Sequence, residues 1–107
     1  MGLPRAHAPA FLVKRARRDA KFREAMFTQA LNACLGGDSR TGKAMLRDLV
    51  NATIGFEGLA EEVKKPSKSL HRMLAERGNP STENFFGIVL ALQKKTRVRL
   101  RVSPRDD

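Results

Sequence analysis

Apolar residues recur at helical spacing in one short segment after another, and this pattern constrains the fold more than any other feature. In residues 19–35, Phe27, Leu31, Cys34 and Leu35 follow the i, i+4, i+7, i+8 spacing of an amphipathic helix. Further segments with apolar faces begin near residues 39, 56, 67 and 82. We therefore predict an all-α fold of five helices. No apolar run approaches the about 20 residues that a membrane span needs.

Residues that stop or start a helix separate these segments. Gly36-Gly37 can take the left-handed conformation that ends a helix, and Asp38 or Ser39 can cap the helix that follows. Residues 78–80 (Gly-Asn-Pro) close the segment that begins near residue 67, because proline cannot continue the turn. A chain of 107 residues with such short connections is expected to form one domain.

The sequence period changes near the C-terminus. Residues 97–102 alternate arginine strictly with valine or leucine, which is the pattern of a half-buried strand. No other segment has this pattern, so such a strand would lack a partner within its own chain. We predict a short C-terminal β-strand over residues 97–102 that pairs with the same strand of a second subunit and so makes a homodimer. The alternative is a tail without regular structure.

The charge of the chain is strongly positive and unevenly spread. Lys and Arg number 21 against 11 Asp and Glu, a formal net charge of +10 that makes a polyanion the leading partner. Residues 1–18 combine a basic run with Pro4 and Pro9 and few large apolar residues, so we predict a flexible basic arm there. Residues 19–102 are then the folded domain.

No motif indicates catalysis. Residues 37–43 look like the start of a phosphate-binding P-loop, but Ala44 stands where Ser or Thr is needed and a helix precedes the segment. Neither His7 nor His71 has a Cys or carboxylate at metal-ligand spacing, and the lone Cys34 lies on an apolar stripe. We expect no enzymatic activity, no metal and no cofactor, and one free cysteine fits a cytoplasmic protein.

The most informative feature is a pair of short helices predicted over residues 56–63 and 67–77. Two such helices with a turn of about three residues are what a helix-turn-helix needs. The apolar residues of the second helix must face the core, so its polar residues must face outward. Because residues 64–72 contain no acid, we favour DNA binding over a plain helical pair in a bundle. The predicted DNA-binding residues are Lys64, Lys65, Ser67, Lys68, Ser69, His71 and Arg72.

Leu59-Ala60, Val63, Leu70 and Leu74 reproduce the apolar skeleton of the Xre-type, lambda-repressor-like helix-turn-helix family, which this segment resembles. Over residues 19–102 the chain also resembles the HigA-like antidote proteins of addiction modules. Ser69-Leu70, Leu74 and Gly78-Asn79-Pro80 carry most of that likeness. The resemblance implies a five-helix domain that binds double-stranded DNA as a dimer, represses its own operon and neutralises a RelE-like toxin.

The resemblance also implies roles for individual residues. Ser67, Lys68 and Arg72 would read bases, Ser69 and His71 would flank them, and Lys64 and Lys65 would meet phosphate. The chain departs from the family at two positions: Lys64 replaces a glycine of the turn, and Phe56 replaces a glutamine that commonly clamps phosphate and recognition helix. Two alternatives stay open: an interaction protein that chiefly holds a toxin, and a stand-alone regulator without one.

Overall fold

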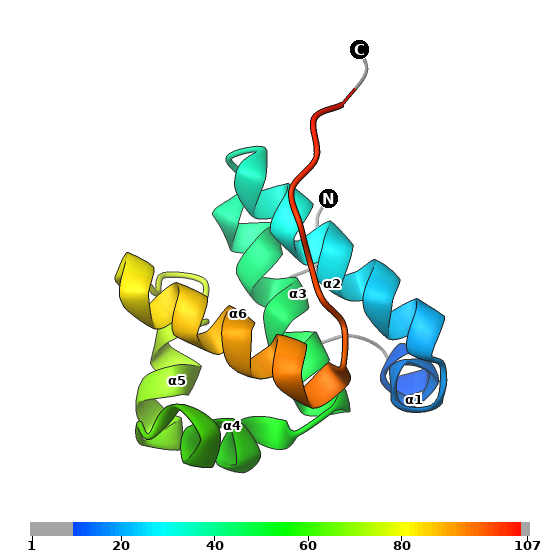
Figure 1. Ribbon diagram of the computed structural model, residues 1–107. Coiled ribbons are helices and arrows are strands. Elements are labelled where there is room, and N and C mark those ends of the chain that lie inside the picture. The colour runs from blue at the N-terminus through cyan, green and yellow to red at the C-terminus, as the bar shows by residue number, and fades with distance from the viewer. Residues whose placement is uncertain (1–9, 106–107) are drawn as a thin grey trace.

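The computed structural model describes residues 10–105, which form six helices and contain no strand (Figure 1). The helices are α1 (Ala10–Arg18), α2 (Ala20–Leu35), α3 (Ser39–Ala52), α4 (Gly55–Val63), α5 (Ser67–Met73) and α6 (Thr82–Thr96). The predicted all-α class is confirmed. None of the helices within residues 10–105 is both long and apolar enough to cross a bilayer.

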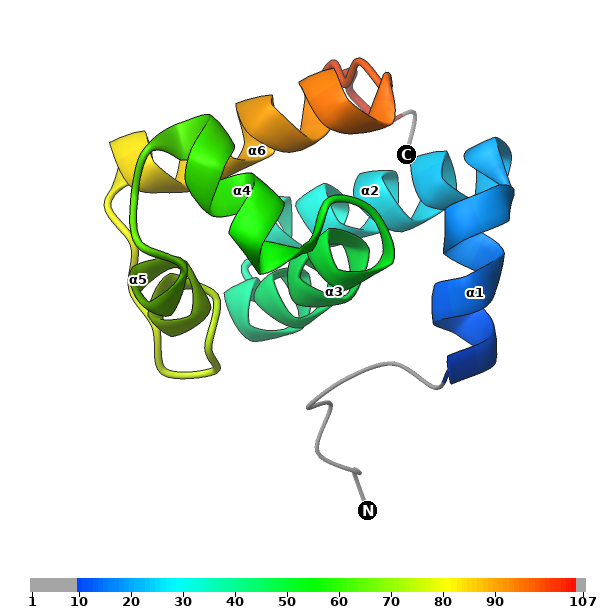
Figure 2. The same cartoon turned by 90° about the horizontal axis from the view of Figure 1, so that it is seen from below.

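Helices α2 and α3 lie side by side and make the most extensive helix–helix contact of the domain. Helix α6 packs on α4, and α4 and α5 lie below it in Figure 1. Seen from below, α1 and α5 lie at opposite ends of the molecule (Figure 2). The core joins residues from five helices. Its fully buried large side chains are Phe27, Leu46, Leu49, Val50, Leu59, Leu70, Leu74, Ile88 and Leu92.

Capping side chains start three of the helices where the sequence predicted. The carboxylates of Asp19 and Asp38 accept hydrogen bonds from the backbone N–H of Phe22 and Thr41, at 3.1 and 3.2 Å. The bond from Phe22 holds the pKa of Asp19 below its ordinary value, and hydrogen bonds from the side chain and the backbone N–H of Thr41 lower the pKa of Asp38. Ser81 caps α6 in the same way. The apolar stripe of α2 ends earlier than predicted, because Leu35 belongs to the last turn and is exposed.

A close approach at Gly42 brings α2 and α3 together. A Cβ atom at this buried glycine would lie 2.3 Å from Cys34 Sγ and 2.9 Å from the carbonyl oxygen of Ala30. Only glycine fits this contact without movement of α2. Cys34 is partly buried there, and the burial raises the pKa of its thiol.

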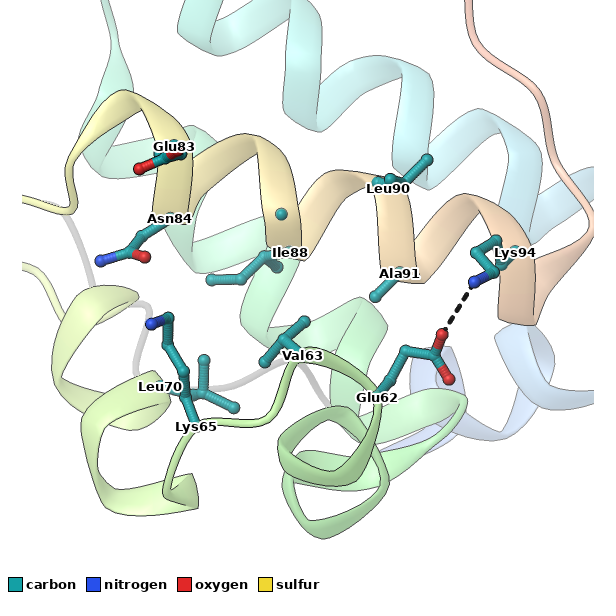
Figure 3. A pocket seen from close by; sticks show the side chains of 11 residues that line it. Glu62, Val63, Lys65, Leu70, Glu83, Asn84, Ile88, Leu90, Ala91 and Lys94 are labelled. Carbon is teal, nitrogen blue, oxygen red and sulfur yellow. Dashed lines mark ion pairs between the residues drawn. The ribbon is translucent and has the colours of Figure 1, made fainter.

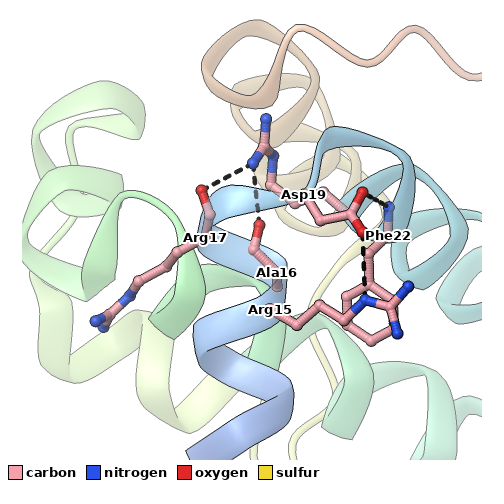
Figure 4. Close-up of polar contacts among 6 residues, drawn as sticks. Arg15, Ala16, Arg17, Asp19 and Phe22 are labelled. Atoms are coloured by element: carbon pink, nitrogen blue, oxygen red, sulfur yellow. Dashed lines mark hydrogen bonds and ion pairs between the residues drawn. The ribbon is translucent and has the colours of Figure 1, made fainter.

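Helix α1 corrects the prediction of a flexible arm over residues 1–18. Arg23 donates to the carbonyl oxygens of Ala16 and Arg17, both at 3.0 Å, and so caps the end of α1 (Figure 4). Arg17 donates to the carbonyl oxygen of Asn51 on α3, and Ala16 is fully buried. Arg17, which belongs to the basic run, therefore helps to hold α1 on α3. Residues 1–9 of the predicted arm lie outside the described residues.

The C-terminal segment corrects the prediction of a strand over residues 97–102. Arg97 caps the end of α6 in the left-handed conformation, and residues 97–105 have no regular secondary structure. The apolar side of the segment packs on its own chain: Val98 is buried, and Leu100 packs against the core and donates its backbone N–H to Gln93 Oε1 at 2.9 Å. A strand needs a partner strand, and residues 10–105 supply none.

We predict that Gly42→Ala destabilises the protein. Overpacking costs about 1–3 kcal/mol, which exceeds the about 1 kcal/mol that alanine gains in helix propensity. Urea unfolding followed by circular dichroism measures the change. Ser39→Ala, at the exposed first residue of the same helix, is the matched control and should stay within about 0.5 kcal/mol of wild type. Equal stability of the two variants would contradict the close approach.

Candidate nucleic-acid interface

Helices α4 and α5 form the predicted pair, and residues 64–66 join them. Lys64 ends α4 in the left-handed conformation, with φ 61° and ψ 47°. Its backbone N–H donates to the carbonyl oxygen of Ala60 at 2.8 Å. Glycine takes this conformation freely, whereas a residue with a Cβ atom is disfavoured by about 1–2 kcal/mol. The turn therefore places a strained lysine beside α5.

Helix α5 turns its apolar residues inward and its basic residues outward. Leu70 and Leu74 are fully buried, while Lys68, His71 and Arg72 are exposed. Ser67 and Ser69 are half-buried, and Lys64 and Lys65 are exposed in the turn. The structure thus gathers all seven predicted residues around one short helix. In residues 10–105, no hydrogen bond or ion pair occupies the side chains of Lys68 and Arg72.

Two side-chain contacts tie the start of α4 to α5. The rings of Phe56 and His71 stack with centroids 3.8 Å apart and planes inclined by 19°. The Ser67 hydroxyl donates to Glu57 Oε2 at 3.1 Å. Phe56 stands where the resemblance predicts a clamping glutamine, and these two contacts lie at the same helix start. Ser67 and His71 are both predicted to lie at DNA. Through these contacts they also hold α5 in position against α4.

Basic residues of α3 hold the chain that follows α5. Lys43, only 6% exposed, donates from Nζ to the carbonyl oxygens of Glu76, at 3.2 Å, and Gly78. Arg47 donates from Nη1 to the carbonyl oxygen of Leu74. Buried carbonyl groups need such partners, because an unpaired one loses its hydrogen bonds to water. These bonds fix the C-terminal end of α5 against α3.

Gly78 explains why α5 ends at Met73, four residues before the predicted end at residue 77. A Cβ atom at Gly78 would lie 2.2 Å from the carbonyl oxygen of Arg72 and 2.4 Å from that of Met73. The chain therefore folds back directly onto the end of the helix, and only glycine permits this approach.

The residues of α3 that position α5 were not predicted from the sequence. Lys43 lay in the segment that looks like the start of a P-loop, yet its ammonium binds carbonyl oxygens of the same chain. The available signal was the spacing of Arg40, Lys43 and Arg47, which puts three cations on one face of α3. Arg40, at the exposed end of this row, pairs with Glu76 at 3.3 Å.

A pocket of about 350 Å³ opens between the α4–α5 turn and α6 (Figure 3). Val63, Leu70, Ile88 and Ala91 supply its apolar lining. At its edge Glu62 pairs with Lys94 at 3.0 Å and with Lys95 at 3.5 Å. These lysines hold the pKa of Glu62 below its ordinary value. The described residues contain no cluster of three or more His, Cys, Asp or Glu that could hold a metal.

No protein-family model matches the chain, and comparison with curated proteins and with solved structures finds no match. The interpretation of this surface therefore depends on its geometry and on the motifs of the sequence.

We predict that Lys43→Met destabilises the protein by about 1–3 kcal/mol, because two carbonyl oxygens lose their donor while the apolar stem is kept. Chemical denaturation measures the loss. Arg40→Met removes an exposed ion pair of the same row and should have a clearly smaller effect. Equal effects of the two substitutions would show that the buried ammonium does not hold the end of α5.

Lys64→Gly is expected to stabilise the protein by about 0.5–1 kcal/mol. Relief of the left-handed strain is partly offset by the greater freedom of glycine in the unfolded chain. Lys65→Gly is the control, because φ at Lys65 is not positive. Glycine there relieves no strain and only adds freedom to the unfolded chain, so it should destabilise the protein. Thermal unfolding of both variants is the measurement, and a melting temperature lowered alike in both would refute the strain at Lys64.

Proposed function

We propose that the protein binds double-stranded DNA in a sequence-specific manner through α4 and α5. The observation that carries the proposal is the outward basic side of α5, where the Lys68 and Arg72 side chains are free within residues 10–105. Lysine and arginine donate to the guanine acceptors of the major groove. The contacts of α5 to α3 and α4 support this role, because base readout needs a helix of fixed orientation.

The proposal gives the seven residues different tasks. Lys68 and Arg72 read bases. Lys64 and Lys65, in the turn, bind phosphate and fix the position of the protein on the duplex. Ser67, Ser69 and His71 flank the readers, and the contacts of Ser67 to Glu57 and of His71 to Phe56 hold the reading side in place.

The finer assignment of the fold is part of the proposal. Helices α2 to α6 would be the five-helix, lambda-repressor-like domain, with α1 as an addition at the end far from α5. Its support is the resemblance carried by Leu59-Ala60, Val63, Leu70 and Leu74, together with the helix-turn-helix order of α4 and α5.

We further propose that the protein is a dimeric, cytoplasmic repressor and an antitoxin that controls its own operon and binds a RelE-like toxin. This rests on the likeness to HigA-like antidote proteins. The pairing of residues 97–102 with another chain stays a prediction. It is supported by their exposed arginines and by Val102, which is 79% exposed.

Binding to a duplex from the protein's own promoter tests the proposal. Lys68→Ala and Arg72→Ala should each weaken this binding by about 1–3 kcal/mol and relax base preference at one position. Lys14→Ala, on α1 at the opposite end of the molecule, is the control and should leave base preference unchanged. Gel retardation and competition with random duplex measure both quantities.

The same titrations at several salt concentrations give a second readout. Each neutralised phosphate contributes roughly −0.9 to the slope of log affinity against log salt. A flat slope, or equal losses on operator and random DNA for Arg72→Ala, would overturn the assignment.

A further inference from the structure

The outer face of α6 carries large apolar side chains that its own chain does not cover. Phe86 is 55% and Leu90 58% exposed, whereas Ile88 and Leu92 on the opposite face are buried. Single exposed apolar residues are common on protein surfaces and carry little information alone. Here a glycine and two opposite charges share the face with them.

Gly87 lies at the pocket between α6 and the α4–α5 turn, where no close contact within its own chain requires a glycine. A Cβ atom at this position would meet no atom within 4 Å, and φ is not positive. Glycine inside a helix is nevertheless less favourable than alanine. What glycine offers at such a place is room for another molecule to come close to the helix backbone.

The charged and apolar residues on this face have a symmetric order. Glu83, Gly87, Leu90 and Lys94 follow one side of α6 at i, i+4, i+7 and i+11. Glu83 and Lys94 lie near opposite ends of the helix with Leu90 between them (Figure 3). The midpoint of Glu83 and Lys94 coincides with the midpoint of Gly87 and Leu90, between residues 88 and 89.

An antiparallel copy of α6 related by a two-fold axis at this midpoint would therefore complement the face. Glu83 would meet the Lys94 position of the other copy, and Leu90 would fit over the gap at Gly87. Both contacts would occur twice. In the single chain Glu83 has no ion pair among residues 10–105, and Lys94 is bound to Glu62 but remains 62% exposed. The side chain of Lys94 thus has donors left for a second carboxylate.

We propose that a second copy of this chain docks on α6 through this face, as an antiparallel and isologous helix pair. The proposal deepens the proposed function by naming the dimer contact. Such a dimer would bring two copies of α5 into one molecule, as two DNA half-sites require. The pairing of residues 97–102 is the rival contact.

A charge exchange between two variants tests the contact in the full-length chain. In Glu83→Lys, two lysines would oppose each other, and in Lys94→Glu, two glutamates would. Each variant alone should dimerise at least about tenfold more weakly than wild type, since like charges at an interface are unfavourable. An equimolar mixture should regain dimers, because both pairs are then complementary. Sedimentation equilibrium over a concentration series measures this.

Two further variants separate the interface from folding. Gly87→Leu should also weaken the dimer at least about tenfold, while circular dichroism shows unchanged helix content. Glu61→Lys makes the same charge change as Glu83→Lys on an exposed position of α4, and it should leave the dimer intact. Selective loss and recovery in the mixture would establish the contact.

Three results would overturn the proposal: a wild-type chain that is monomeric throughout, a Glu83→Lys variant that dimerises like wild type, or a mixture that stays monomeric. None of these measurements involves DNA. A dimer with these properties that fails to retard duplex DNA would refute the proposed function and leave the α6 contact standing. A chain that stays monomeric but binds duplex DNA would refute the α6 contact and leave the proposed DNA binding standing.

Discussion

The buried ammonium of Lys43 is the contact on which the arrangement of the candidate interface depends. It joins α3, the helix that packs most extensively on α2, to the carbonyl oxygens of Glu76 and Gly78 behind α5. A helix of seven residues has little stability of its own, so tertiary contacts must set its orientation. Lys43 and Arg47 do this at one end of α5, and the contacts to Phe56 and Glu57 do it from the side of α4.

These contacts divide the basic residues of the chain into two groups. Lys43, Arg17 and Arg23 are held on backbone carbonyl oxygens and stabilise the fold. Lys68 and Arg72 project from α5 with no partner in the described part of the chain. Composition cannot separate the groups, because a lysine that closes a helix end and a lysine available to a ligand add the same unit to the net charge. Only the position of each side chain distinguishes them.

The same distinction explains how much of the molecule could be predicted. Local signals were reliable: Asp38 and Ser81 begin helices, Gly36-Gly37 ends one, and the seven candidate residues do gather on α5 and its turn. Contacts distant in sequence were missed. Helix α1 needs Arg23 to cap it, and the early end of α5 needs Gly78 to approach Arg72. The alternation in residues 97–102 correctly indicated that Val98 and Leu100 pack on the core, but Val102 is exposed and no partner strand lies within residues 10–105.

Holding a helix end with a cation on a neutral carbonyl oxygen has an electrostatic consequence. A carboxylate partner would cancel the charge, whereas a carbonyl leaves it in place, so the folded chain keeps the positive potential of Lys43, Arg17 and Arg23. This potential opposes compaction through self-repulsion. An anionic ligand that binds only the folded form relieves the repulsion and shifts the folding equilibrium by mass action. Folding and polyanion binding are then two linked equilibria of one charge distribution.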